Sequence, residues 1–350
     1  MKRANGNLAV SLFSGAGGMD IGVQNAGFEN IVSIEQDAHC VSTLNANSSA
    51  REVVHADICS VSPQSIMERF SLRAGDISLL HGGPPCQPFS QIGKRRGIAD
   101  PRGLLIFQMV GFAEVLRPKA VLIEQVPSFL AASMDGTTHV VGELHRRFGA
   151  LGYELHVELL EAQSVGLAQN RRRAFLAAIP SGCSFAFEFA RTRPSRTVGE
   201  AFNGLPQATP KHIPPELPNH IDITPPRDKE RIAYVEEGSW LSKSPNAPPE
   251  IICKLTRKDT TKFRRLHRNL PSPTLRCGEP FYHPTLDRYI TPREAARLQG
   301  FPDEHLFLGP IRGRTGSVRN LDQHRQVANA VPPPLAQSVA SKIKASLCLP

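Results

Sequence analysis

The sequence predicts an α/β fold with a mostly parallel main sheet, joined to a smaller irregular region. Three features support this prediction. Short apolar runs typical of buried strands alternate with segments of helical periodicity from the N-terminus to about residue 180. The first apolar run leads into a glycine-rich turn and then a helix. Between Pro180 and Glu250 the alternation disappears, and 12 of the 30 prolines lie there.

The N-terminal segment predicts a strand, a glycine turn and a helix. Residues 8–13 indicate a buried strand, residues 14–18 are Ser-Gly-Ala-Gly-Gly, and an apolar-periodic helix follows until Gly27. The third glycine of the dinucleotide fingerprint is missing, because Asp20 stands at its position. We therefore expect a cofactor that lacks a pyrophosphate but still approaches the backbone closely.

The next two predicted strands carry acidic residues at their ends. The strand at 30–35 ends in Glu35, and the strand at 52–58 contains Asp57. An acid at the tip of the second strand of such a fold can accept hydrogen bonds from both hydroxyls of a ribose. Asp57 could accept from the exocyclic amine of an adenine. The alternative is that each carboxylate caps a helix or is solvated.

A stiff loop around Cys86 is the centre of the predicted site. The apolar run at 77–80 breaks at Gly82 and Gly83, and prolines at positions 84, 85 and 88 flank the cysteine. Fixed φ angles order such a loop in advance and hold the thiol just past the carboxyl end of a strand. The alternative is a proline-rich surface turn with an incidental cysteine.

Glu124 lies at the end of the strand predicted at 119–126, which is apolar on both faces and therefore central in a parallel sheet. Ligands of open α/β sheets bind outside the carboxyl ends of strands, so Glu124 and Cys86 could share a crevice.

Arg171 and Arg173 precede a strand at 174–179 and are two residues apart, so they could face one site. A surface strip of salt bridges is the alternative.

Further periodic segments complete the prediction. Helices are expected at 64–72, from about 100 to 116 and at 140–148, and a strand at 153–160. Thr291 and Glu294 form a capping-box pattern for a helix that ends at Gly300. An extended stretch is expected from Gln326, followed by a terminal helix at 335–347.

Positive charge is concentrated in one segment. The formal net charge is +9, and residues 251–276 contain eight lysines or arginines but only one acid, Asp259. Such a segment suits a polyanion, and its interleaved apolar residues indicate a folded surface. A solvated face is the alternative.

Cysteine spacing and hydropathy limit the other classes. The seven cysteines are widely spread without a Cys-x-x-Cys pair, so neither a disulfide framework nor a zinc site is indicated and no metal is expected. No apolar run approaches the 18 or so residues of a membrane span. We expect a soluble cytoplasmic protein that does not bind a membrane, and a monomer, since no dimerisation pattern is evident.

Six motifs in order resemble those of the DNA (cytosine-5-)-methyltransferases of the bacterial modification type. They are Phe13-Ser-Gly-Ala-Gly-Gly, Gly82-Gly-Pro-Pro-Cys-Gln-Pro-Phe-Ser, Glu124-Gln-Val, Gln169-x-Arg171-x-Arg173, Thr291-Pro-Arg-Glu-Ala-Ala-Arg-Leu-Gln-Gly-Phe-Pro and Asn329-Ala-Val-Pro-Pro. The resemblance implies a Rossmann-like S-adenosylmethionine-dependent methyltransferase sheet and a smaller irregular target-recognition domain. It places the cofactor-binding and catalytic domain at 1–190, target recognition at 191–275, and a return at 276–350 whose C-terminal helix completes the first domain.

The resemblance also assigns roles to residues. Cys86 is the nucleophile, Glu124 contacts cytosine N3, and Arg171 and Arg173 support the base. The residues implied for S-adenosylmethionine, and for its product S-adenosylhomocysteine, are Phe13, Gly15, Gly17, Glu35, Asp57, Ile58, Gly83, Leu105 and Asn329. Gln125 stands where the family usually has asparagine. The basic runs add expected DNA contacts at Lys94, Arg95, Arg96, Arg257, Lys258, Lys262, Arg264 and Arg265.

The expected reaction is methylation of C5 of a specific cytosine in double-stranded DNA, by a modification enzyme that can have a partner restriction endonuclease. Two alternatives remain open. One is a tRNA cytosine-5 methyltransferase with the same catalytic residues. The other is a catalytically silent relative that only binds DNA, although Cys86 and Glu124 are both intact.

Overall fold

The computed structural model describes residues 7–48, 51–85, 105–134, 137–187, 194–252, 261–312, 320–347 and 349. Predicted site residues outside these ranges are Cys86, Lys94, Arg95, Arg96, Arg257 and Lys258. Contacts divide the chain into two units. The first comprises Met1–Glu161, Arg172–Ala190 and Val331–Pro350, and the second Ala162–Arg171 and Arg191–Ala330. The chain thus rejoins the first unit at Val331, later than the residue 276 expected from the sequence; the assignment of target recognition stays a prediction.

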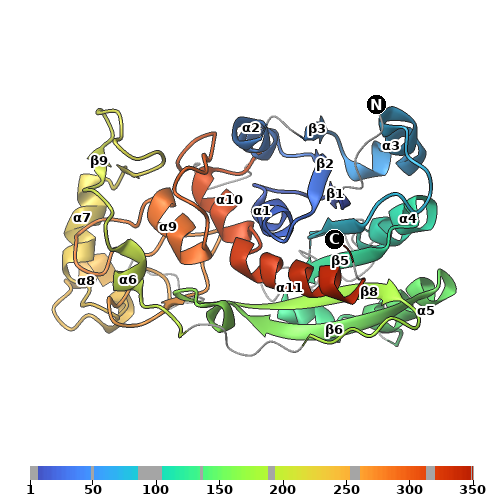
Figure 1. The fold of residues 1–350 in the computed structure, drawn as a ribbon. Coiled ribbons are helices and arrows are strands. Elements are labelled where there is room, and N and C mark those ends of the chain that lie inside the picture. The colour runs from blue at the N-terminus through green and yellow to red at the C-terminus, as the bar shows by residue number, and fades with distance from the viewer. Residues whose placement is uncertain are drawn as a thin grey trace. The chain divides into compact units, whose positions relative to one another are not determined.

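The first unit is built on a central sheet, which has seven strands within the described residues (Figure 1). Its strand order is β3-β2-β1-β4-β5-β8-β6. The strands are β1 (Leu8–Leu12), β2 (Glu29–Glu35), β3 (Glu52–His55), β4 (Leu79–Gly82), β5 (Ala120–Gln125), β6 (Tyr153–Glu161) and β8 (Arg172–Pro180). Within the sheet, β3, β2, β1, β4 and β5 run parallel to one another. Their carboxyl ends therefore meet at one edge.

The position of β5 follows from its apolar sequence. All six of its residues are buried, as expected for a central strand. Its neighbours differ, however: β4 is parallel to β5, whereas β8 is antiparallel to both β5 and β6. The expectation of parallel neighbours on both sides of β5 is therefore wrong on one side, because β8 enters the sheet in the opposite direction between β5 and β6.

Helices pack around this sheet, most of them close to predicted segments, although the helix at 38–47 was not predicted. They are α1 (Gly18–Asn25), α2 (Ala38–Asn47), α3 (Pro63–Phe70), α4 (Ile106–Leu116), α5 (Val140–Ala150) and α11 (Pro333–Ser346), with the 3-10 turns η1 (Ile58–Ser60) and η4 (Pro127–Ala131). The C-terminal helix α11 lies against α1 (Figure 1). Their approach is so close that a Cβ on Gly22 would lie 2.4 Å from the carbonyl oxygen of Pro333. Only glycine leaves room for α11 there.

A buried polar network lies beneath the glycine turn. The carboxylate of Asp20 is fully buried and accepts hydrogen bonds from the hydroxyls of Ser11 (2.6 Å) and Ser33 (2.7 Å). It also pairs with Arg51 at 3.3 Å. A buried charge is tolerated only when such partners satisfy it. Asp20, which replaces the third fingerprint glycine, therefore ties α1 to β1 and β2.

The second unit has many short elements, as its proline content predicts. They are η5 (Ala162–Val165), β7 (Gln169–Asn170), α6 (Val198–Phe202), β9 (Thr209–Pro210), β10 (Ile221–Asp222), α7 (Pro226–Ala233), η6 (Leu241–Lys243), α8 (Pro249–Ile252), β11 (Ser272–Pro273), α9 (Pro292–Gln299) and α10 (Gln323–Asn329). A small core contains Ile232, Val235, Leu241, Tyr282 and Tyr289.

Two elements of this unit test the sequence analysis directly. The capping box of α9 is present: Thr291 accepts from the N–H of Glu294, and Glu294 accepts from the N–H of Thr291. The helix ends at Gly300 with a φ of 82°. The extended stretch expected from Gln326 is wrong, because α10 occupies residues 323–329. Its N-cap, Asp322, accepts from the N–H of Arg325, and the following prolines stop the helix rather than prevent it.

Candidate active site

The glycine turn after β1 has the backbone geometry that its composition requires. Phe13 and Gly15 have φ values of 54°, and Gly17 has a φ of 83°, all in the left-handed region. A Cβ on Gly17 would also lie 3.0 Å from Cδ2 of Leu44. Around Gly15 the added atom would meet nothing within 4 Å. The half-buried backbone at Gly15 therefore leaves room for a ligand to approach it closely.

Glu35 at the end of β2 is bound to this turn. Its carboxylate accepts hydrogen bonds from the backbone N–H groups of Gly15 (2.7 Å), Gln36 (2.8 Å) and Asp37 (2.8 Å). Burial raises the pKa of Glu35, and these three hydrogen bonds oppose the rise. The structure thus brings together Glu35 and Gly15, two residues implied for the cofactor.

The remaining cofactor residues of the first unit lie at element ends. Asp57 is exposed and caps η1 by accepting from the N–H of Cys59 at 2.9 Å, so the capping alternative considered for it is observed. Ile58 is buried and begins η1. Leu105 is half-buried and is the N-cap residue of α4. A cofactor role for these three residues stays a prediction.

Glu124, at the carboxyl end of β5, forms an ion pair with Arg173 of β8. Nε of Arg173 lies 2.7 Å from Oε1 of Glu124, and both side chains are largely buried. The other oxygen, Oε2, faces the backbone that follows β4: a Cβ on Gly83 would lie 3.4 Å from it. Gly83 is three residues before Cys86. The carboxyl group therefore lies beside the start of the segment that carries the cysteine, whose own position is outside the described residues.

Gln125 extends this arrangement. Its side-chain Nε2 donates a 2.8 Å hydrogen bond to the carbonyl oxygen of Pro84, and the glutamine is buried. Proline cannot donate from its own nitrogen, but its carbonyl can accept. The longer amide that replaces the usual asparagine therefore anchors the first residues of the cysteine segment to β5.

Arg171 and Asn329 belong to the second unit. Nη2 of Arg171 donates to the carbonyl oxygens of Ala328 and Ala330, each at 2.9 Å, and the residue is 1% exposed. Asn329 is the last residue of α10, and its Oδ1 accepts from the thiol of Cys277. Arg171 and Arg173 are not on one strand, because β7 ends at Asn170 and β8 begins at Arg172. The strand rule used to place them on one side therefore does not apply.

The basic residues described in the second unit differ in exposure. Lys262 and Arg264 are half-buried at the surface of the unit. Arg265 is 6% exposed, pairs with Asp287 at 2.5 Å and donates to the carbonyl oxygen of Ile232 at 2.7 Å. The guanidinium of Arg265 therefore binds groups of its own unit, and this arrangement does not favour the phosphate contact expected for it.

A family profile described as C-5 cytosine-specific DNA methylase matches residues 8–345. The chain belongs to this family. This DNA methylase is 30% identical over 342 residues to the Type II methyltransferase M1.HphI of Haemophilus parahaemolyticus, with 95% of this chain and 86% of the relative covered. It is 31% identical over 345 residues to the Type II methyltransferase M.PspPI of Psychrobacter sp. (strain TA137), covering 95% and 78%.

A solved structure also resembles this methylase. It is described as a DNA modification methyltransferase encoded within an Escherichia coli prophage, and it superposes with a TM-score of 0.74 at 22% identity, covering 97% of this chain and 99% of that one. At this identity the likeness shows a shared fold. Together with the family match, it confirms the predicted family, the α/β fold class and the reaction: the chain is a DNA cytosine-5 methyltransferase of an S-adenosylmethionine-dependent family.

Sequence reasoning missed two residues of the methylase that shape the site. Asp20 was noted only as a missing glycine, although an acid among the apolar positions of the first helix is a signal for a buried, paired carboxylate. Gln125 was noted only as a departure, and no local pattern predicts its bond to Pro84, 41 residues earlier in the chain.

No helix within the described ranges combines the length and apolar character needed to cross a bilayer. Among the same residues, no group of three or more His, Cys, Asp or Glu side chains is arranged to hold a metal ion.

Proposed function

We propose that this methylase modifies one cytosine of a specific sequence in double-stranded DNA through a covalent bond to Cys86. We further propose that it acts in the bacterial cytoplasm, as a monomer, beside a restriction endonuclease that cuts the same sequence. The observation that supports the site best is the placement of Glu124: held by Arg173 on one oxygen, it presents the other to the segment leading to Cys86.

The glycine turn and Glu35 fit S-adenosylmethionine. The open left-handed turn at Gly15 allows close approach of a ligand, and the carboxylate at the end of β2 can accept hydrogen bonds from ribose hydroxyls. Asp57, Leu105 and Asn329 are the further residues that we assign to it. When bound, the cofactor supplies a methyl group activated by a positive sulfur.

The chain's residues must activate the cytosine, because C5 of the ring is a weak nucleophile. Addition of the Cys86 thiolate to C6 forms a C–S bond and pushes electrons into the ring. Glu124 supplies a proton or hydrogen bond at N3, where negative charge collects, and Arg173 keeps the carboxyl group oriented. After methylation, loss of the C5 proton permits elimination of the thiolate. A stacked base cannot expose C6, so the target must be flipped out of the duplex.

Covalent trapping tests this proposal. A duplex library with 5-fluorocytosine at candidate sites, incubated with the protein and the methyl donor, should yield a complex that survives denaturing electrophoresis, because fluorine cannot leave C5 as the proton does. Cys86→Ser should form none. Trapping that persists in Cys86→Ser would remove the cysteine from the mechanism. Methyl acceptance by tRNA but not by duplex DNA would support the tRNA alternative instead.

A further inference from the structure

Trp240, the single tryptophan of the chain, lies beside two cationic side chains in the second unit. Nζ of Lys243 and the guanidinium carbon of Arg264 each lie 4.6 Å from the centre of its ring. The negative face of an indole attracts cations at this distance. The positive charges of Lys243 and Arg264 therefore both lie near the Trp240 ring, and their separation is at most twice their distance from its centre.

The backbone around Trp240 fixes this arrangement. Trp240 and Arg264 face each other in an antiparallel bridge. On either side of it, the N–H of Leu241 donates to Phe263 at 3.2 Å and the N–H of Arg265 donates to Ser239 at 3.0 Å. Side chains alternate between faces along such a segment. Arg265 points into the unit and is buried, whereas Arg264 lies with Trp240 on the other face.

Among the described residues, no carboxylate pairs with either cation of this pair, Lys243 or Arg264. Several other cations of the unit have carboxylate partners: Arg231 pairs with Asp228, Arg265 with Asp287 and Arg268 with Glu237. Burial and, second, the positive charge of Arg276 lower the pKa of Arg264. A half-buried guanidinium in this setting is stabilised by an anion from outside the chain.

We propose that Lys243 and Arg264, held by the ring of Trp240, form a binding subsite for a backbone phosphate of duplex DNA. A guanidinium presents paired donors that match phosphate oxygens, and an ammonium adds a point charge. Because Trp240 restrains both side chains, less conformational freedom is lost on binding. This inference rests on the proposed duplex DNA substrate. It adds Trp240 and Lys243, which lie outside the basic run noted in the sequence, and it excludes Arg265.

Trp240 reports on its own site, since all tryptophan emission of the protein arises from it. Titration of the full-length protein with a duplex of about 30 base pairs at low salt should change the tryptophan emission and saturate with binding. Titration with tRNA of equal phosphate concentration is the comparison. Emission that stays constant while an anisotropy signal from labelled duplex shows binding overturns the proposal. A response to tRNA only overturns it as well.

Salt dependence provides the second measurement. Each phosphate contact contributes about 0.9 to the slope of log affinity against log salt concentration for duplex DNA. Lys243→Gln and Arg264→Gln should each lower the magnitude of that slope, by up to this amount, and Arg264→Lys should keep most of it. Lys229→Gln is the matched control, because Lys229 is already paired with Asp222 at 2.7 Å and should leave the slope unchanged.

The outcomes distinguish this subsite from the proposed function. If Lys243→Gln and Arg264→Gln fold, as judged by circular dichroism, and keep the wild-type slope, the subsite is wrong even when methyl transfer to duplex DNA is intact. If Arg264→Gln does not fold, the slopes of Lys243→Gln and Arg264→Lys decide, since the first removes and the second retains a charge. If the wild-type protein methylates no duplex DNA, the proposed function itself fails.

Discussion

Nε of Arg173 lies 2.7 Å from Oε1 of Glu124, with both side chains largely enclosed within the first unit. The partners come from antiparallel neighbours, β5 and β8. An ion pair with one carboxylate oxygen restrains the orientation of the carboxyl group. It thereby directs Oε2 toward Gly83 and the start of the cysteine segment. In the proposed mechanism the two residues act together: Glu124 carries the proton, and Arg173 orients the carboxyl group that delivers it.

Glu124→Gln tests the first of these two roles. The amide keeps the shape of the side chain but cannot transfer a proton to N3, so we expect kcat for methyl transfer to fall by about 10²- to 10⁴-fold. The dissociation constant of S-adenosylmethionine should change little, because Glu124 is not among the residues assigned to it. Tritium transfer to DNA and isothermal calorimetry measure the two quantities. A variant with wild-type kcat would show that the carboxyl group is dispensable.

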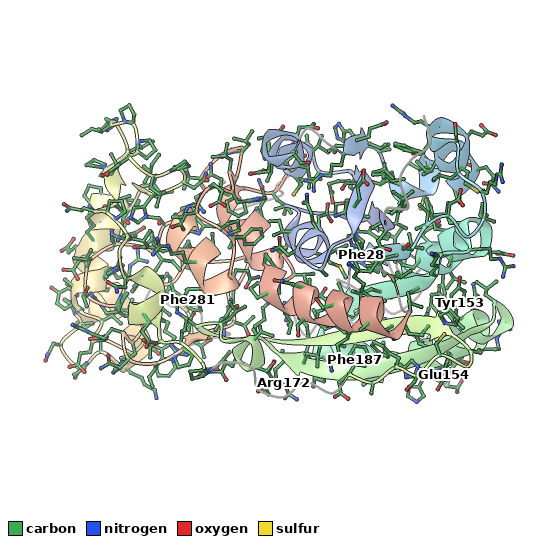
Figure 2. All side chains as sticks on the ribbon, viewed as in Figure 1. Phe28, Tyr153, Glu154, Arg172, Phe187 and Phe281 are labelled. Carbon is green, nitrogen blue, oxygen red and sulfur yellow. The ribbon has the colours of Figure 1, made fainter. Side chains whose placement is uncertain are left out.

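Arg173→Ala tests the second role, with its neighbour Arg172→Ala as the control. Arg172 is the first residue of β8, and Figure 2 shows it at the opposite end of the β6–β8 pair from Glu154. It is exposed, and its Nε lies 3.5 Å from Oε1 of Glu161. Removing the charged partner of a largely buried carboxylate costs about 1.5–3 kcal/mol, so Arg173→Ala should lower kcat by about 10- to 150-fold. Arg172→Ala should stay within about twofold. Equal losses in the two variants would contradict a positioning role.

If Glu35 binds the ribose as proposed, cofactor binding should depend on pH. Burial raises the pKa of its carboxyl group, so Glu35 takes up its proton at a higher pH than an ordinary glutamic acid. Ribose hydroxyls donate to the ionised form. The affinity for S-adenosylmethionine should therefore be full above the raised pKa and be lost as the pH falls through it. Glu35→Gln should bind about 10- to 150-fold more weakly and without this dependence. Calorimetric titrations of both proteins at neutral and mildly acidic pH provide the comparison.

His81 links the stability of the first unit to pH. It is fully buried in β4, with Nε2 2.8 Å from Oδ1 of Asn30, and burial lowers its pKa to about 4. The unfolded chain binds a proton at His81 near pH 6.5, so stability is complete above that pH and falls toward the folded pKa. The loss is about 2 kcal/mol at pH 5. The free energy of urea unfolding should depend less on pH in His81→Asn than in wild type. The exposed His212→Asn is the control and should show the wild-type dependence.

The local elements were readable from the sequence because their signals are local. The glycine turn, the fully apolar β5 and the capping box of Thr291 are recognisable within a dozen residues, and the structure has each of them. The helix α10 was missed for the same reason: three prolines after Val331 dominated the pattern, although the cap at Asp322 lies further upstream. Short-range preferences describe such segments only when their signals agree.

The sequence by itself determined the family and the reaction, because the chemistry requires particular residues in recognisable neighbourhoods; Cys86 and Glu124 are the reacting groups that it predicts. Only the tertiary structure decided which partners those groups have. Arg173 meets Glu124 while Arg171 binds backbone carbonyls of its own unit, and Arg264 lies at the surface while Arg265 is buried. Adjacent arginines look alike in a sequence, and only the pairing of strands and the burial of one face give each a different role.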